Sequence, residues 1–386
     1  MSDDAMTPDA AAPADAVTPD AAAGGAVTRR RRPLAWIAAA AVAGAAAVLS
    51  AVLVAEPDVT LVPARVVSAD VEVTVPESVA AMGVPAVRTT EPYEGLGTWL
   101  DVFDFSPPYG PGGEAALDPI VLDEMAAQGV RTVFIQAARL EERSPDVLED
   151  RWVLAEMLMR ADAADIDLVG WYLPFWGDDG EDLAHLKAIA DFTFMGLRFD
   201  GIAVDIEWNA DGLEPAERSD RLVRLSQQLR DHVGPDTALG AITMPPVLLE
   251  VINEDFWPEF PWARLEPLYD VWMPMSYWSF RSDESGYGDG YAYNEESTRR
   301  LRNNLGDPEA LVHGIGGIGG VADNAATLSG PEPLAEVEDL VLFAQSLVDT
   351  ASIGGSIYDW RTLDPLARET LDTLFSDGIA AGLGAG

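Results

Sequence analysis

The sequence predicts an α/β protein built around a (β/α)8 barrel, or TIM barrel, that follows an N-terminal region of a different kind. Beyond residue 96, short apolar runs alternate with amphipathic segments, the pattern of parallel strands joined by crossover helices. Eight such units fill about 280 residues, close to the ~250 residues of a typical barrel. An open doubly wound sheet is the alternative, but no G-x-G-x-x-G motif follows the first strand. We therefore expect the barrel.

The expected strands are short and rich in β-branched and aromatic residues. They are Thr98–Phe105, Arg131–Ala137, Leu168–Tyr172, Gly201–Glu207, Ala238–Met244, Val271–Tyr277, Leu311–Ile315 and Gly355–Asp359. Amphipathic helices are expected at Asp118–Gln128, Pro145–Ala164, Glu181–Met195, Pro215–His232, Glu295–Asn304, Pro333–Asp349 and Pro365–Phe375. The fifth connection, residues 245–270, is rich in Trp and Pro and less regular. In this fold the carboxyl ends of all strands meet at one rim, where active sites form.

The N-terminal region predicts a membrane anchor. Residues 1–33 are mostly Ala, Pro, Asp and Thr and end in an arginine cluster, a composition that favours a disordered tail. Residues 34–55 contain no charged residue, and a helix of this length spans a ~30 Å hydrocarbon core. The arginines then lie in the cytoplasm and the C-terminal domain lies outside the cell membrane, in a single-pass arrangement. A cleaved signal peptide is the alternative, although the apolar run exceeds the ~7–15 residues of such peptides.

A stalk and the barrel domain complete the predicted organisation. Residues 56–95 carry scattered prolines with short β-type runs between them, which indicates a stalk. Residues 96–386 form the barrel domain.

Composition excludes several classes of function. The chain holds 24 Lys and Arg against 65 Asp and Glu, a net charge of −41, and its one lysine is Lys187, so nucleic acid is not a partner. It has no cysteine and three histidines, so we expect no disulfide, no metal site and no cofactor. Any catalysis by this protein would therefore use carboxylates, hydroxyls and aromatic rings.

Carboxylates and aromatic rings are concentrated at the expected strand ends. Glycan chemistry needs both, because acids move protons and flat apolar faces stack on sugar rings. The candidate substrate-binding residues are Gln136, Tyr172, Tyr277, Trp278, Asp359 and Trp360.

The fourth strand carries the sharpest signal. Side chains alternate along a strand, so Ala203, Asp205 and Glu207 face inward. The Cα atoms of Asp205 and Glu207 are then ~6.6 Å apart, and two like charges at this spacing raise the pKa of one carboxyl group. We expect Glu207 to be the protonated general acid. The alternative is that Arg139 or Arg361 holds the two carboxylates for stability alone.

Residues 200–207, Asp-Gly-Ile-Ala-Val-Asp-Ile-Glu, resemble the D-G-x-D-x-D-x-E signature of glycoside hydrolase family 18, the chitinase-like barrels. Met275-Ser276-Tyr277 is similar to the start of that family's M-x-Y-D, and Gly354-Gly355 followed by Trp360 is similar to its G-G-x-M-x-W, with the tryptophan one place later. The resemblance implies that Glu207 is the acid and base, that Asp205 orients the substrate's N-acetyl oxygen, and that Tyr277 assists. Ala203 and Trp278 stand where the family has aspartate. The chain also looks like uncharacterised actinobacterial membrane-anchored barrels whose opening strand reads W-x-D-V-x-D.

Without assistance by the substrate, a second carboxylate must serve as nucleophile or base. Asp101 is the preferred candidate, with Asp104 and Asp359 as alternatives at the same mouth. The sequence thus predicts a membrane-anchored, extracytoplasmic glycoside hydrolase that acts on O-glycosyl bonds of a glycan. The alternative is a non-catalytic carbohydrate-binding or cell-envelope scaffold barrel, which Ala203 favours.

Overall fold

The computed structural model describes residues 89–383, except 178, 208, 210–211, 282 and 319–335. The predicted tail, the apolar segment 34–55 and most of the predicted stalk lie outside the described residues. Within the described part, no helix is both long and apolar enough to cross a membrane.

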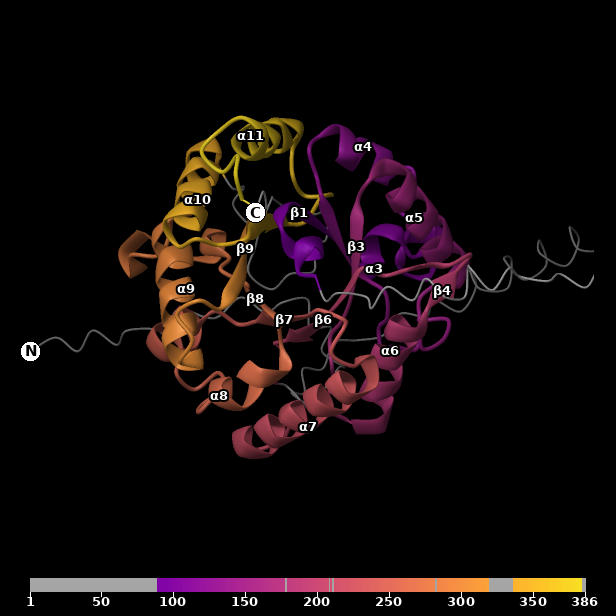
Figure 1. Cartoon of the computed structure of the whole chain (residues 1–386), viewed down its shortest axis with the longest axis horizontal. Helices are drawn as coiled ribbons and strands as arrows, with labels where there is room; N and C mark the ends of the chain where they lie inside the picture. The colour runs from indigo at the N-terminus through magenta and orange to yellow at the C-terminus, as the bar shows by residue number, and fades with distance from the viewer. Residues whose placement is uncertain are drawn as a thin grey trace, which may run out of the picture. The chain divides into compact units, whose positions relative to one another are not determined.

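The described chain forms the predicted barrel (Figure 1). Parallel strands close on one another in the order β1-β10-β9-β8-β7-β6-β3-β2, and the first strand pairs with the last, with Thr98 opposite Ile357. The strands are β1 (Gly95–Leu100), β2 (Thr132–Gln136), β3 (Asp167–Tyr172), β6 (Gly201–Ile206), β7 (Leu239–Thr243), β8 (Val271–Pro274), β9 (Leu311–Ile318) and β10 (Gly354–Tyr358). Each lies within a few residues of its predicted position, since every buried strand is a short apolar run.

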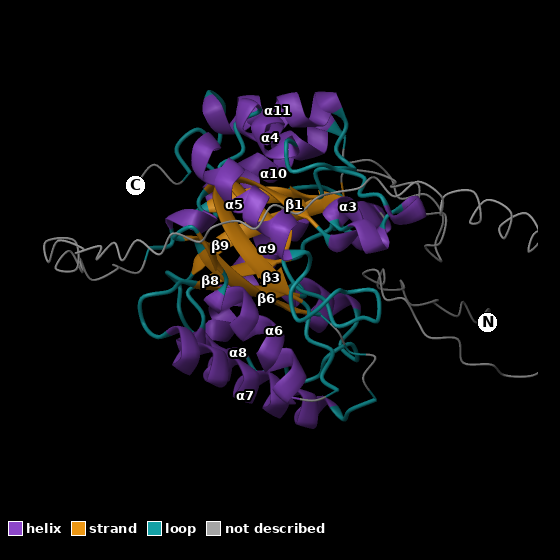
Figure 2. Ribbon diagram, turned by 90° about the vertical axis from the view of Figure 1, so that its right-hand side faces the viewer, coloured by secondary structure: helices purple, strands orange, loops and turns teal. Residues whose placement is uncertain are grey.

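Helices surround the strands (Figure 2). They are α4 (Val121–Ala127), α5 (Arg151–Ala164), α6 (Asp179–Asp191), α7 (Pro215–Val233), α8 (Trp262–Leu265), α9 (Ala292–Leu305), α10 (Val337–Asp349) and α11 (Pro365–Ser376). The connection from β7 to β8 is irregular, as expected, with one π-helical turn at Leu248–Ile252 before the short α8. The sequence predicted a helix up to Met195, but α6 ends at Asp191 and a small antiparallel hairpin follows, β4 (Thr193–Phe194) and β5 (Leu197–Arg198).

Tyr93 closes the amino-terminal end of the barrel. Its side chain is fully buried, and its hydroxyl donates to the backbone carbonyls of Ile202 at 2.9 Å and Ala238 at 3.2 Å. A Cβ atom at Gly201 or Gly240 would lie within 2.8 Å of the Tyr93 ring or hydroxyl, so these two strand positions have room for glycine alone. Tyr93, which the sequence assigned to the stalk, is therefore part of the barrel core.

The chain leaves the first strand earlier than the sequence predicted. β1 ends at Leu100, and residues 102–105 form the short helix α3 (Val102–Phe105) instead of continuing the strand. Asp101 caps this helix by accepting from the N–H of Phe103, and Asp104 accepts from the N–H of Asp101. This capping box satisfies donors that a helix start leaves without partners.

A hydrogen-bonded chain fixes Trp99 inside the barrel. The Trp99 indole N–H donates to Ser356 Oγ at 2.8 Å, Ser356 Oγ lies 2.9 Å from His313 Nε2, and His313 Nδ1 lies 2.8 Å from the carbonyl oxygen of Tyr93. Because that carbonyl only accepts, Nδ1 carries the proton and Ser356 donates to Nε2. Burial lowers the pKa of His313 to about 4, so the ring is neutral. The Trp99 ring also stacks on the Phe134 ring inside the barrel, with the two centroids 4.5 Å apart.

Candidate active site

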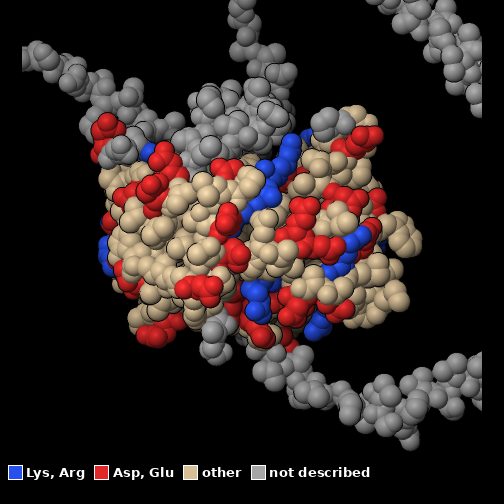
Figure 3. All heavy atoms as spheres, turned by 90° about the horizontal axis from the view of Figure 1, so that it is seen from above, with Lys and Arg blue, Asp and Glu red and all other residues tan. Residues whose placement is uncertain are grey.

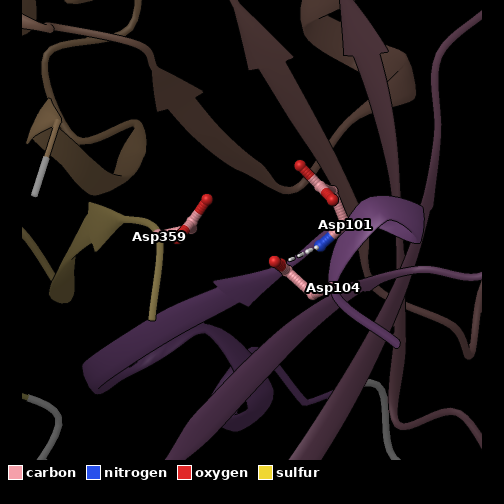
Figure 4. Close-up of side chains that lie close together, drawn as sticks. All are labelled: Asp101, Asp104 and Asp359. Atoms are coloured by element: carbon pink, nitrogen blue, oxygen red, sulfur yellow. Dashed lines mark hydrogen bonds between the residues drawn. The ribbon is translucent and has the colours of Figure 1, made fainter. Parts of the chain in front are cut away.

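Three aspartates meet at the carboxyl end of the neighbouring strands β1 and β10 (Figure 4). Asp101 follows β1, Asp104 lies on α3, and Asp359 follows β10. Carboxylate oxygens of the three lie within 4.8 Å of one another, and each residue is at most 6% exposed. The preferred candidate Asp101 and both its alternatives thus form one cluster, because the turn into α3 brings Asp104 back beside Asp101.

Each of the three carboxyl groups accepts at least one hydrogen bond from the protein. Asp101 accepts from the N–H of Phe103 at 2.7 Å and from the hydroxyl of Tyr358 at 2.8 Å. Asp104 accepts from the N–H of Asp101 at 3.0 Å, and Asp359 accepts from the N–H of Thr362 at 2.9 Å. This donor set fits carboxyl groups that share protons, and we assign no metal ligand to it.

The cluster holds protons at neutral pH. Burial, with the charges of Asp101 and Asp359, raises the pKa of Asp104 to about 9. Burial and the charge of Asp101 raise the pKa of Asp359 to about 7. The Arg361 guanidinium, 3.8 Å from Asp104, offsets only part of this effect. Such perturbed carboxyl groups in a barrel mouth are typical of catalytic sites.

Asp205 and Glu207 form a second acidic group, at the end of β6. Ala203 faces the barrel interior, because a Cβ atom at Gly240 would lie 3.2 Å from the Ala203 Cβ, and Asp205 follows on the same side. Asp205 is 6% exposed, and its Oδ1 has no hydrogen-bond partner among the described residues. Burial and the charge of Glu207 raise the pKa of Asp205 well above its ordinary value. The sequence placed the raised pKa on Glu207, but Asp205 is the more buried of the two.

The two acidic groups lie on different sides of the mouth. β6 is separated from β1 by β3 and β2, and from β10 by β7, β8 and β9. Since all strands run in parallel, both groups lie at the same end of the barrel.

The predicted binding residues differ in their access to the mouth. Tyr277 is half-buried, with its ring 6.0 Å from that of Tyr358. Gln136 is buried and accepts from the N–H of Val102, so it supports the start of α3.

Three of the predicted aromatic residues are buried elsewhere. Tyr172 donates to Asp182 and stacks on His185. Trp278 packs against Phe343 of α10, and Trp360 lies under the Arg368 guanidinium of α11. All three are at most 2% exposed, so their rings offer no surface to a sugar in this structure.

Tyr358 is a site residue that sequence reasoning missed. It ends β10, is half-buried, and its hydroxyl binds Asp101. Strand alternation from the inward-facing Ser356 could have placed it at the mouth.

The two arginines considered as partners of Asp205 and Glu207 face other carboxylates. Arg139 Nε lies 3.0 Å from Glu141, and Arg361 faces Asp104. Acidic side chains are spread over the face seen in Figure 3, with the basic ones lying among them. This pattern offers no concentrated positive patch on that face.

The barrel fold is similar to that of several glycoside hydrolases of known structure. The spore cortex-lytic enzyme SleL of Bacillus cereus superposes with a TM-score of 0.51 at 9% identity, over 72% of this chain and 73% of that one. The endo-β-1,4-mannanase of Thermotoga petrophila gives 0.51 at 13% identity, over 74% and 77%. A family 18 chitinase of Cycas revoluta gives 0.50 at 9% identity, over 72% and 99%.

These likenesses confirm the predicted distant resemblance to family 18 barrels at the level of the fold. The similarity to actinobacterial barrels is not shown. No family model matches the sequence, and the comparison with curated proteins finds no match.

Proposed function

We propose that this barrel is a glycoside hydrolase that cleaves O-glycosyl bonds of a glycan by carboxylate acid–base chemistry. One observation carries the proposal. Two groups of buried carboxyl groups with raised pKa values, around Asp205 and around Asp104, lie at one barrel mouth on different strands. Glycosidases use a pair of carboxyl groups that flank the scissile bond.

Glu207 is the acid in this proposal. Asp205 and Glu207 cannot both ionise freely, because burial and mutual repulsion keep one proton on the pair. Glu207 is less buried than Asp205, so it is the member of the pair that reaches the glycosidic oxygen. In this proposal the two carboxyl groups share the proton that burial favours on Asp205, and Glu207 delivers it to the leaving group.

Asp101 is the second carboxylate. Both its oxygens accept hydrogen bonds, which suits an ionised group, while its neighbours Asp104 and Asp359 carry the cluster's protons. Asp101 and Glu207 come from strands that are not adjacent in the barrel, and in this proposal a water molecule lies between Asp101 and the sugar. Asp101 then acts as the base that activates this water.

The proposal extends to location. Arg29–Arg32 and the uncharged residues 34–55 support a single-pass anchor with the barrel outside the cell membrane. The substrate would then be an extracellular or cell-envelope glycan.

One observation favours a non-catalytic glycan-binding barrel instead. Ala203 offers no hydrogen bond to its neighbour on the strand, and Asp205 Oδ1 has no partner within the described part. If Asp205 lacks hydrogen bonds that hold it in place, the Asp205–Glu207 pair would be poorly oriented for proton transfer, and the barrel would bind a sugar without cleaving it.

An activity screen separates the two functions. The full-length protein is incubated with neutral glycans from pH 4 to 9, and new reducing ends and bound glycan are both measured. The hydrolase predicts release of reducing ends with a bell-shaped pH profile. Binding without release at every pH would support the non-catalytic barrel.

A further inference from the structure

We propose that Tyr358 is a positioning residue of the active site, whose hydroxyl aims the Asp101 carboxylate while its ring supports the mouth. The inference rests on the proposed function, because it concerns how the second carboxylate is oriented. Tyr358 corresponds to none of the residues that the resemblance implies.

Contacts hold the Tyr358 ring in place. Its centroid lies 6.2 Å from that of Trp99 and 6.0 Å from that of Tyr277. Trp99 is itself held by Ser356, two residues before Tyr358 on the same strand. These contacts place the phenol hydroxyl beside its acceptor, Asp101.

Two donors hold the Asp101 carboxylate. The Tyr358 hydroxyl donates to Oδ2 at 2.8 Å, and the N–H of Phe103 donates to Oδ1 at 2.7 Å. With a donor on each oxygen, rotation of the carboxylate breaks at least one hydrogen bond. The Phe103 bond belongs to the cap of α3, and Tyr358 supplies a second support from the neighbouring strand β10.

Asp101 lies among other acidic side chains, so a hydrogen-bond donor favours its ionised form. Asp104 and Asp359 face Asp101 within 4.8 Å, and Arg361 lies beside Asp104 as the nearby cation. Hydrogen-bond donors favour the ionised form of an acid, so loss of the phenol would let Asp101 turn or take a proton from the cluster.

The variant Tyr358→Phe tests the idea, because it keeps the ring and removes only the hydroxyl. We expect kcat to fall about tenfold to a hundredfold, with KM changed less than about threefold, because the substitution keeps the ring and changes only the support of Asp101. The acid limb of the pH–rate profile should move to higher pH, because ionised Asp101 has lost a donor.

Tyr291→Phe is the matched control. The Tyr291 hydroxyl donates to Asp349 at 3.0 Å, so this variant also loses a tyrosine–aspartate hydrogen bond, but at an exposed site outside the mouth. Its kcat, KM and pH profile should match those of the parent protein.

A second measurement separates failure of this inference from failure of the proposed function. The unfolding temperatures of the parent and Tyr358→Phe are compared between pH 4 and 8, which needs no substrate. The hydroxyl stabilises ionised Asp101, so its contribution is present at neutral pH and is lost as the pH falls. The difference in unfolding temperature between the two proteins should therefore become smaller toward pH 4.

The possible outcomes are distinct. A protein without hydrolase activity would overturn the proposed function, while a difference in unfolding temperature that becomes smaller toward pH 4 would still support the link between Tyr358 and ionised Asp101. An unchanged kcat and pH profile in an active enzyme, or a pH-independent difference in unfolding temperature, would overturn the positioning role.

Discussion

The backbone N–H of Asp101 donates to the Asp104 carboxylate at 3.0 Å, while Asp101 caps the same helical turn. One local motif, Asp101-Val102-Phe103-Asp104, thus ends the first strand and supplies two of the three clustered carboxyl groups. The two residues of the capping box are thus also two members of the acidic cluster. A substitution here changes local stability and site electrostatics together.

Asp104→Asn should change how stability depends on pH. The pKa of Asp104 is raised to about 9 by burial and like charges, so the folded state binds a proton that the unfolded state releases above about pH 4. The free energy of unfolding of the parent protein should therefore decrease from about pH 4 to 9, by up to about 1.4 kcal/mol per pH unit from this group. Denaturant unfolding at several pH values should show a smaller decrease in the variant.

Asp236→Asn controls for this prediction, because Asp236 is exposed and lies outside the cluster. Its pH dependence should follow that of the parent protein. If the free energy of unfolding decreased with pH equally in Asp104→Asn and in the parent, Asp104 would not carry the proton that we assign to it.

The sequence predicted the barrel well, because every buried strand is a short apolar run between amphipathic segments. It also placed Asp101, Asp104 and Asp359 at one mouth. It missed the turn at Asp101, because Val102, Phe103 and Phe105 have strand propensity and the cap that overrides it depends on side-chain hydrogen bonds. Strand-end position alone also could not show that Trp278 and Trp360 face the helices α10 and α11.

The stereochemistry of the product should identify the second carboxylate. If Asp101 acts as the base, water attacks the anomeric carbon opposite the leaving group and the anomeric configuration inverts. Proton NMR of the first product formed from an oligosaccharide should show the inverted anomer. A retained anomer would contradict a single displacement with Asp101 as base, and would indicate a nucleophile supplied either by Asp101 or by the substrate.

Neutral glycans should be preferred over polyanionic ones. The chain carries a net charge of −41, and Arg139 and Arg361 both face carboxylates of the protein itself. Binding measured at low salt should be at least tenfold weaker for a uronic-acid polymer than for a neutral glycan of the same length. Tighter binding of the polyanion would show that one of these arginines turns toward the ligand.

The proposed anchor predicts the result of limited proteolysis on intact cells. If residues 34–55 span the membrane with the barrel outside, added protease should release a fragment that begins within residues 56–95. Protection of the barrel until the cells are lysed would place it inside and contradict the expected orientation.

The most direct measurement of the central claim is hydrolysis by Glu207→Gln. The substitution keeps the shape of the side chain but removes its transferable proton, and general acid catalysis contributes about 10²–10⁴-fold. On a glycan that the parent protein cleaves, kcat should fall by this factor while binding of the glycan is retained, and Asp205→Asn should also lower kcat. Unaltered hydrolysis by Glu207→Gln would remove Glu207 from the mechanism and place the acid in the cluster of Asp101, Asp104 and Asp359.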